Sequence, residues 1–278
     1  MTSAGKWIPL ECNPEVFNTW AKRAGLVTSQ ACFGDVYGLD EELLAMVPQP
    51  TKALILIFPL SGQIKEKHQA EDEKLKSEGG GVPVDPTVIW IKQTIRNACG
   101  TMALLHSLMN SDVTFAPHSA LYQFVEQCQN ITPDERAHLL ETTNLFSHIH
   151  ADTASQGQSA VTDEVMNTDL HFAAFVAAPE PDLREKASTG QGVAGIASAV
   201  VDVVKDGVAA VGAQGSSGSA DAKTTGMRLI ELDGTRSGPL DRGPCNNFLA
   251  DAAKYIRENY ISSSSSVQFS ILALGPPE

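Results

Sequence analysis

The chain has 278 residues, with 33 acidic side chains against 20 Lys and Arg, and a formal net charge of −13. Hydrophobic residues make up 42% and charged residues 19%, which is typical of a globular domain and excludes collagen, coiled coil and wholesale disorder. The acidic balance argues against a nucleic-acid partner, because phosphate binding needs a cationic face.

The cysteines are odd in number and widely spaced, at positions 12, 32, 99, 128 and 245. No C-x-x-C pair occurs, so we expect neither a zinc ribbon nor a redox pair, and no metal. The first residues lack the apolar core of a signal peptide, and no run of about 20 nearly uninterrupted apolar residues predicts a membrane span. We therefore expect a cytoplasmic protein with reduced thiols.

The first half of the chain is predicted to be mostly helical. Apolar periodicity and capping residues predict helices over 15–23, 40–46, from about 97 or 98 onward, 119–128 and 133–142. The continuous apolar run 53–58 predicts a strand buried on both faces. Residues 62–82 are almost all charged or glycine and predict a solvated loop or short exposed helix without a chemical role.

The second half is predicted to contain most of the strands. They are expected over 170–176, 227–232 and 267–272, with one helix over 247–259 and a polar loop over 151–168. Residues 178–226 change to Ala, Gly, Ser and Val, which favours a surface insertion with one amphipathic helix over 193–208. These elements predict a single α+β domain spanning 1–278.

Cys99 differs from the other cysteines in its surroundings. It lies in Asn97-Ala98-Cys99-Gly100-Thr101, where the expected apolar helix begins. The free N–H groups and the dipole at that helix end favour an anion and would stabilise a thiolate. The alternative, for any single cysteine, is a small hydrophobic residue of the core.

Three further residues supply the groups that a thiolate nucleophile needs. His171 opens an apolar strand, Asp233 ends another, and Gln93 lies six residues before Cys99, at an expected strand end. Taken singly, they fit a structural histidine, a turn-forming Asp-Gly pair and a surface Gln. Together they match a thiol protease, in which histidine takes the thiol proton, aspartate fixes its tautomer and glutamine donates to the oxyanion.

These segments resemble the ubiquitin carboxyl-terminal hydrolases, a family of papain-like cysteine proteases. The similarity runs in one order along nearly the whole chain except 178–226. It is carried by the segments Trp7–Glu15, Val36–Leu44, Phe58–Leu60, Lys92–Thr101, Asp169–Phe172 and Leu232–Gly234.

The resemblance implies a role for each residue of this set. Cys99 would be the nucleophile, His171 its general base and acid, and Asp233 the residue that orients His171. Gln93 and the backbone N–H of Cys99 would form the oxyanion hole. The implied fold is a central, mostly antiparallel sheet clasped by helices, papain-like and with a knotted backbone. A loop at about 150–168 would straddle the active site, and no cofactor is implied.

The implied substrate is ubiquitin carrying a small adduct or peptide on its carboxyl-terminal glycine. Its tail of basic and glycine residues would lie in a narrow groove, where Glu11, Glu15 and Asp35 could contact it. Exposed solubilising charges are the alternative role for these three. Because 62 residues separate His171 from Asp233, the insertion must leave and return at one edge of their hairpin.

Two other functions stay open. The first is a ubiquitin-binding module without catalysis, which would require misaligned catalytic residues. The second is a thiol hydrolase of another ubiquitin-like modifier. For each function we expect a monomer.

Overall fold

The computed structural model describes residues 7–154, 166–181 and 226–277, and the following account concerns these residues. Their strands form one sheet in the order β1-β6-β2-β3-β4-β5, in which every neighbouring pair is antiparallel. The strands are β1 (Cys32–Asp35), β2 (Ala53–Pro59), β3 (Leu170–Pro179), β4 (Met227–Leu232), β5 (Leu240–Pro244) and β6 (Ser270–Gly275). The expected antiparallel sheet is confirmed.

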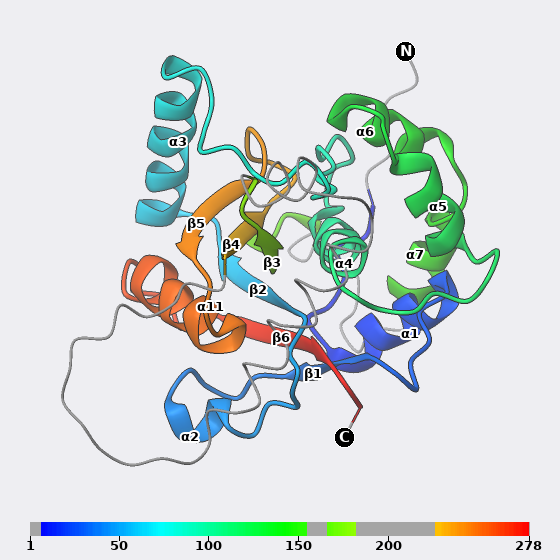
Figure 1. Cartoon of the computed structure of the whole chain (residues 1–278), viewed down its shortest axis with the longest axis horizontal. Helices are drawn as coiled ribbons and strands as arrows, with labels where there is room; N and C mark the ends of the chain where they lie inside the picture. The colour runs from blue at the N-terminus through cyan, green and yellow to red at the C-terminus, as the bar shows by residue number, and fades with distance from the viewer. Residues whose placement is uncertain (1–6, 155–165, 182–225, 278) are drawn as a thin grey trace, which may run out of the picture.

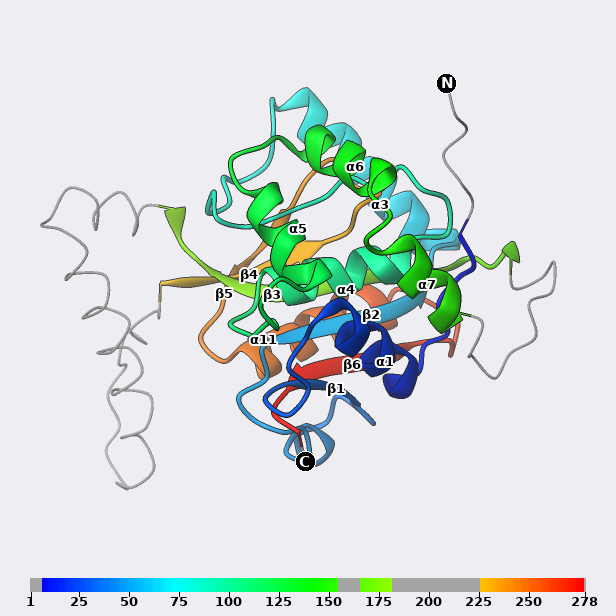
Figure 2. The same ribbon diagram turned by 90° about the vertical axis from the view of Figure 1, so that its right-hand side faces the viewer.

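Helices pack on both faces of this sheet (Figures 1 and 2). One face carries α1 (Pro14–Ala24), α4 (Cys99–Met109), α5 (Ala120–Cys128), α6 (Pro133–Thr142) and α7 (Ser147–Ala154). The other face carries α11 (Phe248–Ile256), which continues into the π-helical turn η1 (Arg257–Ile261). The helices α2 (Glu41–Leu44) and α3 (Gly62–Ser77) lie at the edges. No helix in the described part of the chain is long and apolar enough to cross a membrane.

Local signals set the ends of several helices. Asn13 accepts the Glu15 N–H at 2.8 Å before Pro14 opens α1, and Gly25 ends that helix at φ +120°. Thr132 and Glu135 form a reciprocal capping box at the start of α6. These helix boundaries lie within a residue of the predicted ones.

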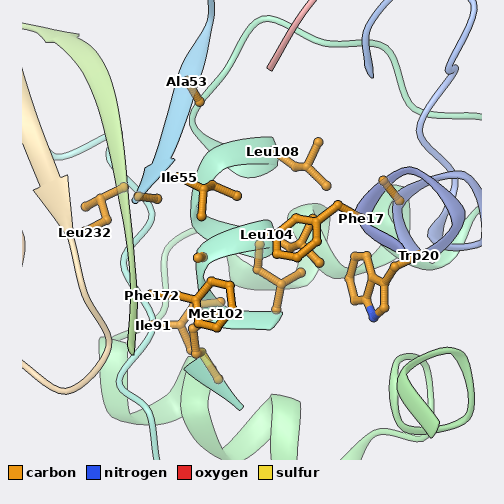
Figure 3. Close-up of a cluster of buried hydrophobic side chains, with 14 of the residues drawn as sticks. Phe17, Trp20, Ala53, Ile55, Ile91, Met102, Leu104, Leu108, Phe172 and Leu232 are labelled. Atoms are coloured by element: carbon orange, nitrogen blue, oxygen red, sulfur yellow. The ribbon is translucent and has the colours of Figure 1, made fainter. Parts of the chain in front are cut away.

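The strand β2 separates two hydrophobic cores because successive side chains of a strand point to opposite faces. Ala53, Ile55 and Ile57 face the core beneath α1 and α4, which is the cluster drawn in Figure 3. The alternate residues Leu54, Leu56 and Phe58 face the core beneath α11. The whole strand is buried, as the apolar run predicted.

Several predictions of local structure are wrong. The apolar segment 88–91 joins no strand, so Gln93 does not lie at a strand end. For the charged segment 62–82 the exposed helix is confirmed, since α3 buries only Ile64, but at 16 residues it is longer than expected. The polar segment expected to be a loop from 151 begins inside α7. The last strand was expected over 267–272 but begins at Ser270. The Phe269 N–H donates to the Val267 carbonyl instead of to a neighbouring strand, and Val267 is 94% exposed.

The insertion leaves and returns at one end of the β3–β4 hairpin. Pro179 pairs with Met227, and the Glu180 N–H donates to the Gly226 carbonyl at 2.9 Å. His171 lies at the opposite end of β3, about 26 Å away at roughly 3.3 Å per residue. The insertion therefore departs far from His171. Residues 182–225, including the helix expected over 193–208, lie outside the described residues.

Candidate active site

Cys99 is the first residue of α4, the helix that runs through the larger core. Every residue from Cys99 to Leu108 is buried, because α4 packs against β3 and β2 and shares the larger core with side chains of α1 and α5. The Cys99 side chain lies at the open N-terminal end, where it is 8% exposed. The sulfur is thus held at the end of a fixed element, beside N–H groups that have no intrahelical partner.

The two strands next to each other in the sheet bring His171 and Asp233 together. His171 is the second residue of β3, and Asp233 directly follows β4. The His171 Nε2 atom lies 2.9 Å from Asp233 Oδ1, and both side chains are buried. Thr235 adds two donors to the same oxygen, its backbone N–H and its hydroxyl, each at 2.8 Å. The turn after β4 therefore fixes the carboxylate from two directions.

The charges of this pair are mutually stabilised. Burial lowers the pKa of His171, but the Asp233 carboxylate and the hydrogen bonds to Asp233 and to the Cys99 sulfur outweigh it and raise that pKa. Burial raises the pKa of Asp233, but His171 and the Thr235 donors lower it overall. The site therefore favours an imidazolium next to a carboxylate.

The hydrogen bond from His171 to the Cys99 sulfur completes a chain of three side chains. Because Nε2 faces Asp233, Nδ1 is the ring nitrogen left for the thiol proton. The edge of the imidazole ring packs against Phe58 at a ring-centre distance of 5.6 Å. The arrangement can move a proton between sulfur and ring without moving either element.

Gln93 lies on the irregular segment that precedes α4. Its backbone N–H donates to the Gly234 carbonyl at 2.8 Å, and its side-chain Nε2 donates to the Ile95 carbonyl at 3.2 Å. A Cβ at Gly234 would lie 2.9 Å from the Gln93 Cβ, so this close approach requires glycine. The Gln93 amide keeps a second N–H for a ligand.

These residues line one cavity of about 460 Å³. Cys99, His171 and Gln93 share its wall with the N-terminal segment Ile8–Cys12. Ala154 and Thr168, which belong to the loop expected at about 150–168, also line the cavity, but residues 155–165 of that loop lie outside the described residues. The cavity is large enough for an extended peptide tail of small residues.

The three acidic residues expected to bind substrate divide between two hollows. Glu11 lines the cavity that contains Cys99, whereas Glu15 and Asp35 line a second hollow of about 550 Å³. Cys12 lines the first cavity. Burial, opposed by a hydrogen bond with Ser270 and reinforced by Asp35 and Glu11, raises the pKa of Cys12 to about 11. Glu11 and Asp35 thus both act on the Cys12 thiol.

Sequence reasoning missed the polar groups that support Asp233. Thr235 could have been recognised, because an Asp followed two residues later by an N–H donor forms a local turn. The contribution of Arg236 could not be recognised from the sequence, because its partners Glu71 and Asp72 lie on α3, far away along the chain. Arg236 is 4% exposed and also faces the buried Glu231. The helix expected to have no role thus packs against the Asp233 turn.

Within the described ranges, no group of three or more His, Cys, Asp and Glu side chains is placed to hold a metal ion. The polar groups that line the cavity include a thiol, an imidazole and an amide, which are the groups of nucleophilic acyl transfer.

Comparison with known proteins agrees with this chemistry. Residues 7–184 match the family model described as ubiquitin carboxyl-terminal hydrolase, family 1. Ubiquitin carboxyl-terminal hydrolase isozyme L1 of Rattus norvegicus is 32% identical over 270 residues, 96% of each chain. Ubiquitin carboxyl-terminal hydrolase 3 of Arabidopsis thaliana is 29% identical over 277 residues, 98% of this chain and 95% of that protein.

Solved structures share the fold. The catalytic domain of Trichinella spiralis UCH37 bound to ubiquitin vinyl methyl ester matches with a TM-score of 0.62 at 20% identity, covering 99% of this chain and 98% of that one. A second UCH37 structure with the same ligand gives a TM-score of 0.61 at 18% identity, covering 98% and 83%.

Proposed function

The chain belongs to family 1 of the ubiquitin carboxyl-terminal hydrolases, and we propose that Cys99 is the nucleophile with which it releases adducts from ubiquitin. It is a deubiquitinating thiol hydrolase. The observation that supports the assignment of Cys99 is that Cys99 and His171 line one cavity and His171 is hydrogen-bonded both to Cys99 and to the buried Asp233.

In the first half of the reaction, the Cys99 thiolate attacks the carbonyl carbon of the last glycine of ubiquitin. The negative charge that develops on the carbonyl oxygen is received by the Gln93 side-chain N–H and the backbone N–H of Cys99. His171 gives its proton to the leaving amine as the carbon–nitrogen bond breaks. The products are the free amine and a thioester between ubiquitin and Cys99.

In the second half, water replaces the amine. His171, now neutral, takes a proton from the attacking water, and the thioester carbon again passes through an oxyanion at the same donors. Collapse of this intermediate returns the electron pair to sulfur and releases ubiquitin with a free carboxylate. The raised pKa of His171 supports its role as the holder of this proton.

Substrate recognition is proposed for the acidic side chains along the cleft. A basic, glycine-containing tail would pass Asp35 and Glu11 on its way to Cys99, with Glu15 at the outer hollow. The two UCH37 structures are of enzymes bound to a ubiquitin derivative, which supports ubiquitin as the partner. The net charge of −13 favours the approach of a basic tail.

A fluorogenic ubiquitin substrate, with a dye on the terminal glycine, tests the proposal. We expect turnover by the wild type, none by Cys99→Ser, and retained ubiquitin binding by that variant. Turnover by Cys99→Ser would contradict the role of Cys99. Binding without turnover by the wild type would instead favour the inactive module, and faster cleavage of another modifier would reassign the substrate.

A further inference from the structure

A fully buried histidine lies on the same helix as Cys99 and has no place in the reaction above. His106 is two turns further along α4 and is 0% exposed. Its Nε2 accepts the Ile91 N–H at 2.9 Å. One side chain of α4 therefore holds the backbone of the segment that carries Gln93.

This segment, Ile89–Gln93, is hydrogen-bonded both to the end of α4 and to the turn formed by Asp233 and Gly234. Asn110 at the end of α4 accepts the Ile89 N–H at 2.7 Å. The Trp90 indole donates to the Asp233 carbonyl at 3.0 Å, and the Gln93 N–H donates to Gly234 at 2.8 Å. Ile91 is buried in the cluster of Figure 3 beside α4. The segment has no strand partner, so these bonds determine its position.

We propose that His106 is a positioning residue that holds Gln93, and through its segment the turn at Asp233, in register with Cys99. Its Nε2 fixes Ile91, two residues before Gln93, and the same segment bonds the carbonyls of Asp233 and Gly234 through Trp90 and Gln93. A shift of this segment relative to α4 would move the oxyanion donor, and the turn bonded to it, away from the sulfur. This inference rests on the proposed function of Cys99, Gln93 and Asp233.

Only the neutral ring can accept the Ile91 N–H. A protonated His106 would direct an N–H at the Ile91 N–H, and two donors repel each other. The charged groups that act on the ring are Asp233, which favours protonation, and Arg136, which opposes it. Burial dominates, and it lowers the pKa of His106 to about 4. The acceptor is therefore available at neutral pH.

The test compares two substitutions of His106 in the full chain. His106→Met keeps the volume but removes both polar groups, whereas the amide of His106→Gln supplies an acceptor and a donor. We expect kcat of His106→Met on the fluorogenic substrate to fall roughly 10- to 100-fold with little change in KM, because displaced catalytic groups lower kcat. His106→Gln should recover most of that loss.

Leu108→Ala serves as the matched control, because Leu108 is also buried on α4 but makes no bond to the segment. It should lower the denaturation midpoint while kcat per folded molecule stays at the wild-type value. Amide hydrogen exchange gives a readout independent of activity: the Ile91 and Gln93 amides should exchange faster in His106→Met and stay protected in Leu108→Ala.

Wild-type kcat and unchanged Ile91 protection in a folded His106→Met would overturn the proposal. So would an equal kcat loss in His106→Met and Leu108→Ala, because it would mean loss of stability alone. An inactive wild type would reject the proposed function instead, and the exchange data would still report whether His106 holds the segment.

Discussion

Two regions of the molecule bury histidines with opposite effects on their charge. At the ends of β3 and β4, His171 touches the carboxylate of Asp233, and its pKa is raised. Beneath the sheet, His106 and His150 bond to backbone groups and to the Thr101 hydroxyl, and burial lowers the pKa of each to about 4. Burial is common to all three, so the contacting carboxylate makes the difference.

The comparison separates the proposed catalytic histidine from the supporting histidines by the groups they contact. A ring that must exchange a proton with sulfur and substrate needs a carboxylate to stabilise its charged form. A ring that links backbone segments needs one acceptor nitrogen, and its charged form would break the link. His150, which joins Thr101 to Ile8 at the cavity wall, belongs to the second kind.

Removal of the Asp233 carboxylate should leave His171 buried without a contacting charge, like His106 and His150, and should produce the largest loss of activity. In Asp233→Asn we expect the His171 pKa to fall below its ordinary value and kcat to drop by roughly 10³- to 10⁴-fold, because the ring loses its tautomer and its stabilising charge. Steady-state kinetics and NMR titration of the ring check both.

Asp241→Asn is the control, because Asp241 is also a buried, ion-paired carboxylate but is bound to Arg228. It should leave kcat unchanged. An equal kcat loss in both variants, or a His171 titration unaffected by Asp233→Asn, would contradict the conclusion that the Asp233 carboxylate sets the charge of His171.

The next effect concerns Gln93, the proposed oxyanion donor. Gln93→Ala should lower kcat roughly 10²- to 10³-fold with a nearly constant KM, because the donor acts mainly on the transition state. Gln123→Ala, an exposed glutamine that bonds only the His118 carbonyl, is the control. A Gln93→Ala enzyme that loses affinity rather than kcat would assign Gln93 to substrate binding.

The supporting histidines should make the fold sensitive to acid. His106 and His150 are neutral when folded and titrate near pH 6.5 when unfolded, so the unfolded chain binds more protons between about pH 6.5 and 4. The free energy of unfolding should therefore decrease as the pH is lowered from about 6.5 to 4, by about 3 kcal/mol for each of the two residues. Chemical denaturation over a pH series measures this loss.

The pair of His171 and Asp233 should change the free energy of unfolding at pH values outside the range from about 4 to 6.5. The raised pKa of His171 stabilises the fold below about pH 6.5, and this contribution is lost as pH rises through the folded value. The lowered pKa of Asp233 stabilises the fold above about pH 4, and this contribution is lost in stronger acid. Stability that is level from pH 7 to 4, or a slope unchanged in His106→Gln, would contradict the assignment.

The smallest effect is expected for the acidic side chains of the cleft. Glu11→Gln should raise KM about 2- to 5-fold at low salt, because a half-exposed charge contributes little and salt screens it. Glu42→Gln on the exposed helix α2 is the control, and kcat should not change in either variant. A KM effect of equal size in both would mean that only the net charge matters.

The sequence predicted those parts of the molecule whose signals are local. The buried run of β2, the caps of α1 and α6, and the position of Cys99 at the start of α4 depend on neighbouring residues, and the structure has them where expected.

Long-range pairing decides what could not be predicted. The short strands β1 and β5 have no apolar alternation of their own and form because β6 and β4 offer free edges. The charged helix α3 gains its role from ion pairs of Glu71 with Arg236 and Arg242, more than 160 residues away. The segment 88–91 has the composition of a strand, but His106 and Asn110 bind its backbone groups instead.

The most direct test of the central claim is covalent capture with ubiquitin that carries a vinyl methyl ester at its terminus, followed by mass-spectrometric mapping of the five cysteines. Burial raises the pKa of Cys128 and Cys245 to about 12 each, and Cys12, at about 11, shares the cavity as an internal control. We predict a single ubiquitin adduct, on Cys99, that Asp233→Asn forms far more slowly. An adduct on Cys12, or a folded protein that forms none, would contradict the account.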